Sequence, residues 1–216
     1  MDELKFAVIG NPVSHSLSPD IHLFFASQFQ LERYTYNKIK SNENDFERDI
    51  NDFFKNGGVG LNVTVPFKGL AYNLCDELDQ SAGLCKSVNT VLIDSGKLIG
   101  HSTDGQGLID DFSHKEITLE DSKILIIGAG GSAASIISSL LSHGKIKEIS
   151  ILNRTKSNAL RLLDLFETNR LLMHEEGDEY DIVINTTPIS MNVDDIILPP
   201  ELIMNKPICY LSLIHI

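Results

Sequence analysis

Short runs of apolar residues alternate along this chain with segments whose apolar residues recur at helical spacing. Ile124 to Ile127 form a continuous apolar run, as a strand buried on both faces requires. Tyr34 to Ile39 has the alternating pattern of a strand, whereas Phe46, Ile50 and Phe54 recur with a helical period. Strands and helices that follow one another in this way predict an α/β fold.

The first half of the chain predicts an α/β domain of its own, residues 1–101. Ser18 as N-cap and Pro19 at the first helical position indicate a helix that runs to about Phe29. The hairpin turn is expected at Asp94 to Gly96. The series comprises strands over 4–9, 34–39 and 59–65, helices over 19–29 and 44–55, helical stretches to about 84, and a hairpin with strands over 87–93 and 97–101.

The second half predicts a second domain, residues 102–216. Asp104 opens a connecting helix, and Gly105 and Gly107 near its start make that helix a plausible hinge. Strands are then predicted over 124–127, 148–153, 181–185 and 207–216, with the clearest helix directly after the first of them. A domain of this kind that ends on a strand looks unfinished.

The strongest local signal is the turn after the strand at Ile124–Ile127. Gly128, Gly130, Gly131 and Ala133 give a G-x-G-x-x-A pattern between a strand and a helix. Glycine lets the backbone turn sharply and approach a pyrophosphate, which the helix N-terminus then holds. The pattern therefore predicts a dinucleotide site in a doubly wound, Rossmann-like domain. A merely structural glycine turn is the alternative.

The end of the next strand favours NADP over NAD. A NAD site usually carries Asp or Glu there for the ribose 2′-hydroxyl, but this chain has Asn153, Arg154 and Thr155. A carboxylate would repel a 2′-phosphate, whereas a guanidinium can bind one through two parallel hydrogen bonds. The alternative is a solvated arginine in a loop.

The composition of the chain limits the kinds of ligand and binding partner that we expect. The chain has 216 residues with 18 basic and 30 acidic side chains, a formal net charge of −12. An acidic surface argues against a nucleic-acid partner and against electrostatic membrane binding. The N-terminus lacks the basic and apolar regions of a secretory signal, and no apolar run approaches the roughly 20 residues that span a bilayer. We expect a cytoplasmic protein with a small-molecule ligand.

Cysteines and histidines give no sign of a metal or of a disulfide framework. Cys75, Cys85 and Cys209 have no C-x-x-C spacing. His15 and His22 are not accompanied by a carboxylate or cysteine cluster with metal-ligand spacing. We therefore expect no metal site.

Four groups of polar residues in or next to the first domain are candidates for chemistry. They are the hydroxyls of Ser16 and Ser18, the strand residues Asn62 and Thr64 with the following Lys68, Asn89 in an otherwise apolar strand, and Asp104 at the domain junction. Each has a structural alternative, such as a helix cap for Ser18 or Asp104 and a solvated amine for Lys68. Together they supply hydroxyls, amides, one amine and one carboxylate for a small polyhydroxylated ligand.

These motifs, in this order, resemble those of the shikimate dehydrogenase family. The resemblance extends from the N-terminus to about residue 191. It rests on 10–12 (Gly-Asn-Pro), 15–19 (His-Ser-Leu-Ser-Pro) with His22, 62–68 (Asn-Val-Thr-Val-Pro-Phe-Lys), 88–90 (Val-Asn-Thr), 103–105 (Thr-Asp-Gly), 128–131 (Gly-Ala-Gly-Gly) and 153–155 (Asn-Arg-Thr).

The resemblance implies an NADP-dependent oxidoreductase of aromatic amino-acid biosynthesis, with residues 1–101 as the shikimate-binding catalytic domain and residues 102–216 as the NADP-binding domain. Lys68 would be the general acid and base, paired with Asp104. The substrate would be bound by Ser16, Ser18, Asn62, Thr64, Lys68, Asn89 and Asp104. The cofactor would be bound by Gly128, Ala129, Gly130, Gly131, Ser132, Asn153, Arg154, Thr155, Lys156, Ser157 and Asn158.

The chain also departs from the family pattern. Ser102 stands where the family usually has Asn, and Ser190 replaces a usual glycine in the loop that begins at Thr186 and faces the cofactor. Residues 211–216 match neither the family's nicotinamide-contacting motif nor its terminal return helices. We expect a chain that is truncated or ends in a foreign tail. An inactive fragment that binds NADP, and a quinate/shikimate dehydrogenase, remain alternatives, with a monomer or a homodimer both open.

Overall fold

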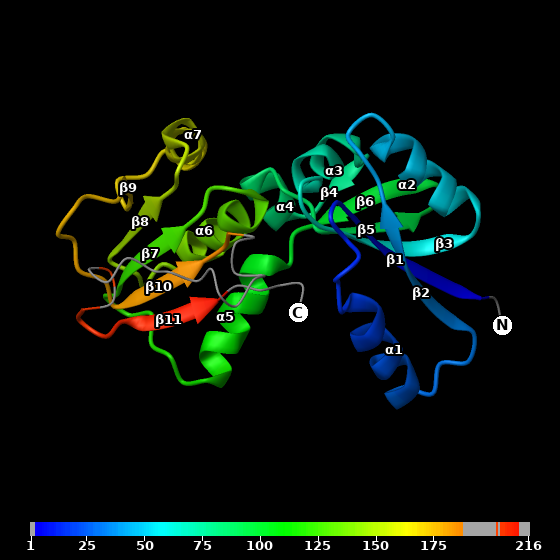
Figure 1. Cartoon of the computed structure of the whole chain (residues 1–216), viewed down its shortest axis with the longest axis horizontal. Helices are drawn as coiled ribbons and strands as arrows, with labels where there is room; N and C mark the ends of the chain where they lie inside the picture. Colours follow the sequence, from blue (N-terminus) through cyan, green and yellow to red (C-terminus); the bar gives the residue numbers. More distant parts are fainter. Residues whose placement is uncertain (1–2, 188–201, 203, 212–216) are drawn as a thin grey trace. The chain divides into compact units, whose positions relative to one another are not determined.

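The computed structural model describes residues 3–187, 202 and 204–211, and the chain divides into two compact units between Thr103 and Asp104 (Figure 1). Each unit contains its own sheet. The predictions for Ser190 and for residues 212–216 lie outside the described residues. In the described part of the chain, no helix has both the length and the apolar character needed to cross a membrane.

The first unit is built on a six-stranded sheet with the order β2-β1-β3-β5-β6-β4. β1 pairs in parallel with both β2 and β3, and β5 and β6 form the predicted antiparallel hairpin beside β3. The strands are β1 (Leu4–Gly10), β2 (Tyr34–Lys40), β3 (Gly58–Val63), β4 (Glu77–Leu78), β5 (Thr90–Asp94) and β6 (Lys97–His101).

Apolar side chains on α2 pack against this sheet. Phe46, Ile50 and Phe54 are buried in one cluster with Ala7 and Leu61 from the central strands, which confirms the predicted apolar face of α2. The helices of the first unit are α1 (Ser18–Gln28), α2 (Phe46–Lys55), α3 (Lys68–Leu74) and α4 (Gln80–Cys85).

Two local predictions in the first unit are wrong. Ser18 is the first residue of α1, and Leu17 occupies the N-cap position without a side-chain capping bond. Ser16 takes over part of that role, because its Oγ accepts a hydrogen bond from the Ser18 N–H at 3.2 Å. Asn89 lies one residue before β5 instead of inside it. Its side-chain amide bonds Thr103, which holds it at the entrance of the strand.

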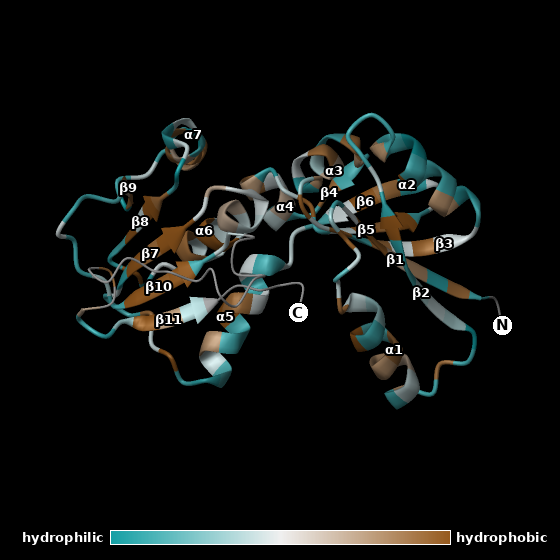
Figure 2. Cartoon of the chain, in the orientation of Figure 1, coloured by the Kyte–Doolittle hydropathy of each residue, from teal (hydrophilic) through white to brown (hydrophobic). Residues whose placement is uncertain are grey.

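The second unit is a parallel sheet with the order β11-β10-β7-β8-β9. Its central strands are the most apolar part of the chain (Figure 2). This is the doubly wound, Rossmann-like order, in which the chain reverses direction on either side of the first strand. The elements are α5 (Asp104–His114), β7 (Lys123–Ile127), α6 (Gly131–His143), β8 (Glu148–Leu152), α7 (Lys156–Phe166), β9 (Leu171–Met173), β10 (Ile182–Asn185) and β11 (Ile208–Leu211).

Gly105 has a packing role in the second unit. A Cβ at this position would lie 2.3 Å from the carbonyl oxygen of Ser135, and the Gly105 N–H donates to Ser135 Oγ at 3.0 Å. α5 and α6 therefore approach closely through this glycine. At Gly107, by contrast, a Cβ would meet no other described residue within 4 Å beyond its own stretch of the helix. Close helix packing thus explains the glycine at position 105, and the hinge expected at Gly105 and Gly107 stays a prediction.

Candidate substrate and dinucleotide sites

The loop before α1 holds two hydroxyl groups beside each other. Ser16 is buried, and its Oγ donates to Ser18 Oγ at 3.0 Å. The loop is attached to β2, since Lys38 Nζ donates to the carbonyl oxygen of Ser14 at 2.7 Å. The two predicted hydroxyls are therefore brought together and held by the sheet.

Asn62 near the end of β3 is held by neighbours on both sides. Tyr36 Oη on β2 donates to Asn62 Oδ1 at 2.7 Å. Asn62 Nδ2 donates in turn to Thr90 Oγ1 on β5 at 3.2 Å. These bonds cross from the edge strand β2 over the sheet to β5 and fix the orientation of the Asn62 amide.

Asn89 continues the same network. Thr90 Oγ1 donates to Asn89 Oδ1 at 3.2 Å, and Asn89 Nδ2 donates to Thr103 Oγ1 at 2.9 Å. The Asn89 carbonyl oxygen accepts from the Val63 N–H at 2.8 Å. The structure thus joins two predicted site residues, Asn62 and Asn89, in one chain of side-chain hydrogen bonds that ends directly before Asp104.

Thr64 and Lys68 are buried in the segment after β3. The Thr64 N–H donates to the Ile9 carbonyl oxygen at 2.9 Å, and Gly10 is required here because a Cβ on it would lie 2.2 Å from Thr64 Cγ2. The side chain of Lys68 is only 4% exposed at the start of α3. Lysine is rarely buried so completely, and the first turn of a helix disfavours a positive charge. The Lys68 carbonyl oxygen accepts from the Val88 N–H at 3.0 Å, which ties α3 to the segment that carries Asn89.

Asp104 is buried at the first position of α5. A carboxylate is favoured there by the helix dipole. Asp104 belongs to the second unit, so its pairing with Lys68 stays a prediction.

The glycine turn of the second unit has the form that a dinucleotide site needs. Gly128 has φ +113°, and a Cβ on it would lie 2.4 Å from Thr186 Oγ1. Gly130 is the N-cap of α6, and a Cβ there would meet no atom of the described residues within 4 Å. Ala129, Gly131 and Ser132 complete the turn and the start of the helix. The turn therefore leaves room for a phosphate group at the N-terminus of a 13-residue helix.

The segment after β8 is exposed and carries positive charge at the start of α7. Asn153 Nδ2 donates to the Thr155 carbonyl oxygen at 2.9 Å, which gives the turn its shape. Arg154 and Lys156 are exposed, as are Ser157 and Asn158. Thr155 is the N-cap and makes no side-chain capping bond. Their role at a ribose phosphate stays a prediction.

The sequence analysis missed three side chains in the first-unit network, namely Tyr36, Thr90 and Thr103. Thr90 and Thr103 lie next to predicted residues, so their positions in the sequence were an available signal. The contact of Tyr36 with Asn62 follows only from the order of the strands in the sheet. Tyr36 on β2 lies opposite Phe6 of β1, and β1 separates β2 from β3. The alternating pattern of β2 predicts the face of the sheet on which Tyr36 lies, but it does not predict that Asn62 is its hydrogen-bond partner.

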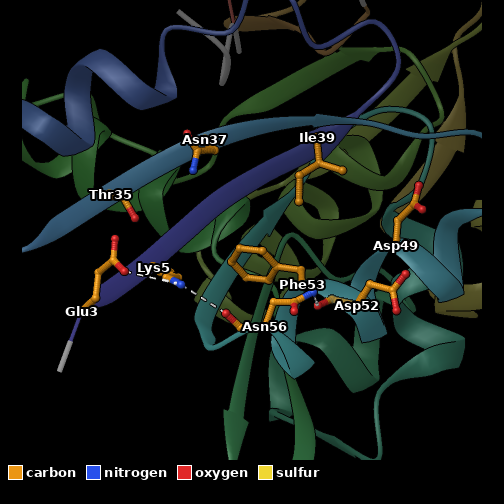
Figure 3. A pocket seen from close by; sticks show the side chains of 9 residues that line it. All are labelled: Glu3, Lys5, Thr35, Asn37, Ile39, Asp49, Asp52, Phe53 and Asn56. Carbon is orange, nitrogen blue, oxygen red and sulfur yellow. Dashed lines mark hydrogen bonds and ion pairs between the residues drawn. The ribbon is translucent and has the colours of Figure 1, made fainter.

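A separate hollow of about 460 Å³ lies on the first unit and contains none of the predicted site residues (Figure 3). Lys5 crosses part of it and bonds Glu3 at 3.4 Å and the Asn56 carbonyl oxygen at 3.3 Å. A second hollow of about 480 Å³ lies on the second unit at Lys123 and Lys206. Neither hollow is lined by the hydrogen-bonded residues Asn62, Thr90 and Asn89. The candidate site is therefore defined by the buried polar residues and not by a hollow. Among the described residues, no group of three or more His, Cys, Asp or Glu side chains could share a metal ion.

Two family models match the chain. Residues 8–91 match the shikimate dehydrogenase substrate binding domain, and residues 111–197 match the shikimate / quinate 5-dehydrogenase domain. The shikimate dehydrogenase (NADP(+)) of Legionella pneumophila (strain Lens) is 43% identical over 207 residues, 95% of this chain and 77% of the relative. That of Acinetobacter baumannii (strain ACICU) is 40% identical over 205 residues, 92% and 78% of the two chains.

Solved structures agree with this result. The shikimate 5-dehydrogenase of Thermus thermophilus, in complex with NADP(H) and shikimate, superposes with a TM-score of 0.76 at 32% identity, covering 85% of this chain and 68% of that one. The substrate-domain match contains Ser16, Ser18, Asn62 and Lys68. The second match contains the glycine turn at residues 128–131. The chain belongs to the shikimate dehydrogenase family of NADP-dependent oxidoreductases.

Proposed function

We propose that this chain catalyses the reversible NADP-dependent reduction of 3-dehydroshikimate to shikimate. The relatives named as shikimate dehydrogenase (NADP(+)) support the reaction. The observation that carries the assignment of the first unit is Lys68, a buried lysine whose backbone bonds Val88, next to Asn89 in the chain. Burying this amine disfavours folding, because removing a lysine side chain from water costs free energy. A role in binding or catalysis accounts for its position.

The reaction needs a group that exchanges a proton with the substrate oxygen. In the oxidation of shikimate, the carbon loses a hydride and the hydroxyl loses a proton, giving the ketone, NADPH and H⁺. The bound nicotinamide supplies the hydride acceptor. Lys68 as a neutral amine accepts the hydroxyl proton, and as an ammonium it returns that proton in the biosynthetic direction. Asp104 orients the reacting hydroxyl by accepting a hydrogen bond.

The remaining polar residues bind the rest of the substrate. Ser16 and Ser18 bind the shikimate carboxylate through their hydroxyls, which rotate from their bonds within the protein to donate to it. The ring hydroxyls bind Thr64 and Asn89, with Asn62 in support. Hydrogen bonds across the sheet of the first unit hold Asn62 and Asn89 in place for this role.

The second unit binds the cofactor. The turn from Gly128 to Ser132 holds the pyrophosphate through backbone N–H groups, which is consistent with the open space at Gly130. Arg154 binds the adenosine 2′-phosphate, and the half-buried Asn153 and the exposed residues 155–158 form the rest of its surroundings. A carboxylate is absent from residues 153–158, so NADP is preferred over NAD.

Spectrophotometry at 340 nm with the purified chain tests this function. We expect NADP⁺ reduction with shikimate, much less with NAD⁺, and much less with quinate, whose extra hydroxyl must fit the same hydroxyl and amide network. Comparable rates with quinate would support the quinate/shikimate alternative. Calorimetric binding of NADP⁺ without turnover of either compound would contradict the proposal and support a chain that only binds the cofactor.

A further inference from the structure

We propose that Tyr36 is a positioning residue for the substrate, because its hydroxyl joins Ser18, at the start of α1, to Asn62 of β3. The inference rests on the proposed function and deepens it. Tyr36 lies on β2, away from the sequence motifs of the predicted site, and is only 5% exposed. It acts on the substrate through Ser18 and Asn62.

The contacts of the Tyr36 hydroxyl support this role. Its oxygen lies 2.7 Å from Asn62 Oδ1 and also bonds the Ser18 side chain. Burial raises the pKa of Tyr36, an effect that the Ser18 hydrogen bond opposes and neighbouring Tyr34 reinforces. The phenol therefore stays protonated over the working range of the protein and serves as a fixed hydrogen-bond donor.

The amide oxygen of Asn62 fixes the direction of the Tyr36 proton. An amide oxygen can only accept, so the single proton of Tyr36 goes to Asn62 Oδ1. Ser18 must then donate to Tyr36, and Ser16 donates to Ser18 at 3.0 Å. With Oδ1 facing Tyr36, the Nδ2 group of Asn62 faces Thr90. Tyr36 thus decides which atoms of Ser18 and Asn62 are oriented toward a ligand.

The ring of Tyr36 is held as firmly as its hydroxyl. His22 on α1 stacks on it with ring centroids 4.3 Å apart and an interplanar angle of 16°. Tyr34 Oη lies 3.3 Å from His22 Nδ1 and fixes that ring in turn. α1 therefore places both Ser18 and His22 against Tyr36, so the phenol links the position of the helix to the sheet.

The test compares Tyr36→Phe with Tyr180→Phe, which removes a buried tyrosine hydroxyl that bonds His174 and Asp178 in the second unit. We expect Tyr36→Phe to raise KM for shikimate about tenfold, since each partner loses a buried hydrogen bond. We expect kcat to change less than about threefold, because Tyr36 takes no part in proton transfer. The Kd of NADP⁺ should match that of the wild type. Tyr180→Phe should leave all three values near those of the wild type.

The outcomes separate the inference from the proposed function. A wild-type chain that neither turns over nor binds shikimate overturns both. An active wild type with an unchanged shikimate KM in Tyr36→Phe, or an equal rise in Tyr180→Phe, overturns the inference alone. Should Tyr36→Phe not fold, as judged by thermal melting, the Ser18→Ala and Asn62→Ala variants and their double variant measure the coupling that Tyr36 provides. Additive effects of these two changes on KM then overturn the inference.

Discussion

Gly128 lies directly against Thr186, at the point where the first strand of the second sheet meets the loop after its neighbour. A Cβ on Gly128 would lie 2.4 Å from Thr186 Oγ1, and Thr186 Oγ1 donates to the Ile127 carbonyl oxygen at 2.9 Å. β7 and β10 are adjacent in the sheet, with their chain connections leading in opposite directions. The glycine turn is therefore fixed at the switch point where doubly wound folds bind nucleotides.

The two glycines of this turn should respond differently to alanine. Gly128→Ala is expected to destabilise the fold by about 1–3 kcal/mol from backbone strain alone, because φ is +113°. Gly130→Ala should leave the melting temperature within about 2 °C of the wild type, since its Cβ meets no described atom. It should still weaken NADP⁺ binding at least tenfold by occupying the space of the pyrophosphate. Calorimetry of Gly130→Ala with unchanged NADP⁺ affinity would contradict a phosphate site at this turn.

Arg154 should determine the choice between NADP and NAD. Removing the guanidinium in Arg154→Ala is expected to raise KM for NADP⁺ by about 10- to 100-fold, since a charged hydrogen bond contributes about 1.5–3 kcal/mol. KM for NAD⁺, which lacks the 2′-phosphate, should change little. Arg161→Ala, further along α7 and also exposed, is the control for loss of charge. Equal losses with both cofactors in Arg154→Ala would refute its role at the 2′-phosphate.

Gly105 and Gly107 provide a test of helix packing with opposite expected signs. Gly105→Ala places a Cβ 2.3 Å from the Ser135 carbonyl oxygen, so we expect a loss of about 1–3 kcal/mol in the free energy of unfolding. Gly107→Ala has open space and should gain about 0.5–1 kcal/mol from helix propensity. Urea denaturation measures both. A Gly105→Ala variant as stable as Gly107→Ala would show that α5 and α6 do not pack as described.

Strand and helix positions followed well from local patterns. The apolar run at Ile124–Ile127, the glycine turn after it and the apolar face of α2 all form as predicted, because each depends on residues close in sequence. The short strands β4 and β9 were not predicted. Strands of two or three residues are too short to show a period, and their sheet neighbours alone define them.

The structure joins some of the predicted site residues by contacts that the sequence did not predict. Asn62 and Asn89 were chosen as unusual polar residues in apolar surroundings, and the structure joins them through Thr90. That contact depends on the antiparallel register of β3 and β5, which no local pattern gives. Tyr36 was missed for the same reason, since β1 lies between its strand and β3. Ser18 was assigned a capping role because its bond to Tyr36 could not be foreseen.

His22 should make stability depend on pH. Burial lowers the pKa of His22 below its ordinary value of 6.5, so the unfolded chain binds the proton more tightly than the folded one. The contribution of His22 to the free energy of unfolding is therefore complete above pH 6.5 and declines as the pH falls below that value. His22→Phe keeps an aromatic ring beside Tyr36 and should flatten the decline between about pH 7 and pH 5. Urea denaturation across this range, with exposed His143→Gln as control, measures the difference; equal pH profiles for His22→Phe and the wild type would contradict it.

Proton transfer by Lys68 is the central claim, and kcat of Lys68→Met tests it most directly. Methionine is close to lysine in volume, so the buried position stays filled while the amine is lost. We predict that kcat for shikimate oxidation falls by about 10²- to 10⁴-fold, with an unchanged Kd for NADP⁺ and no loss of thermal stability. Lys40→Met, at an exposed position of β2, should keep the wild-type rate. A folded Lys68→Met variant that turns over shikimate within about threefold of the wild-type kcat would show that another group moves the proton.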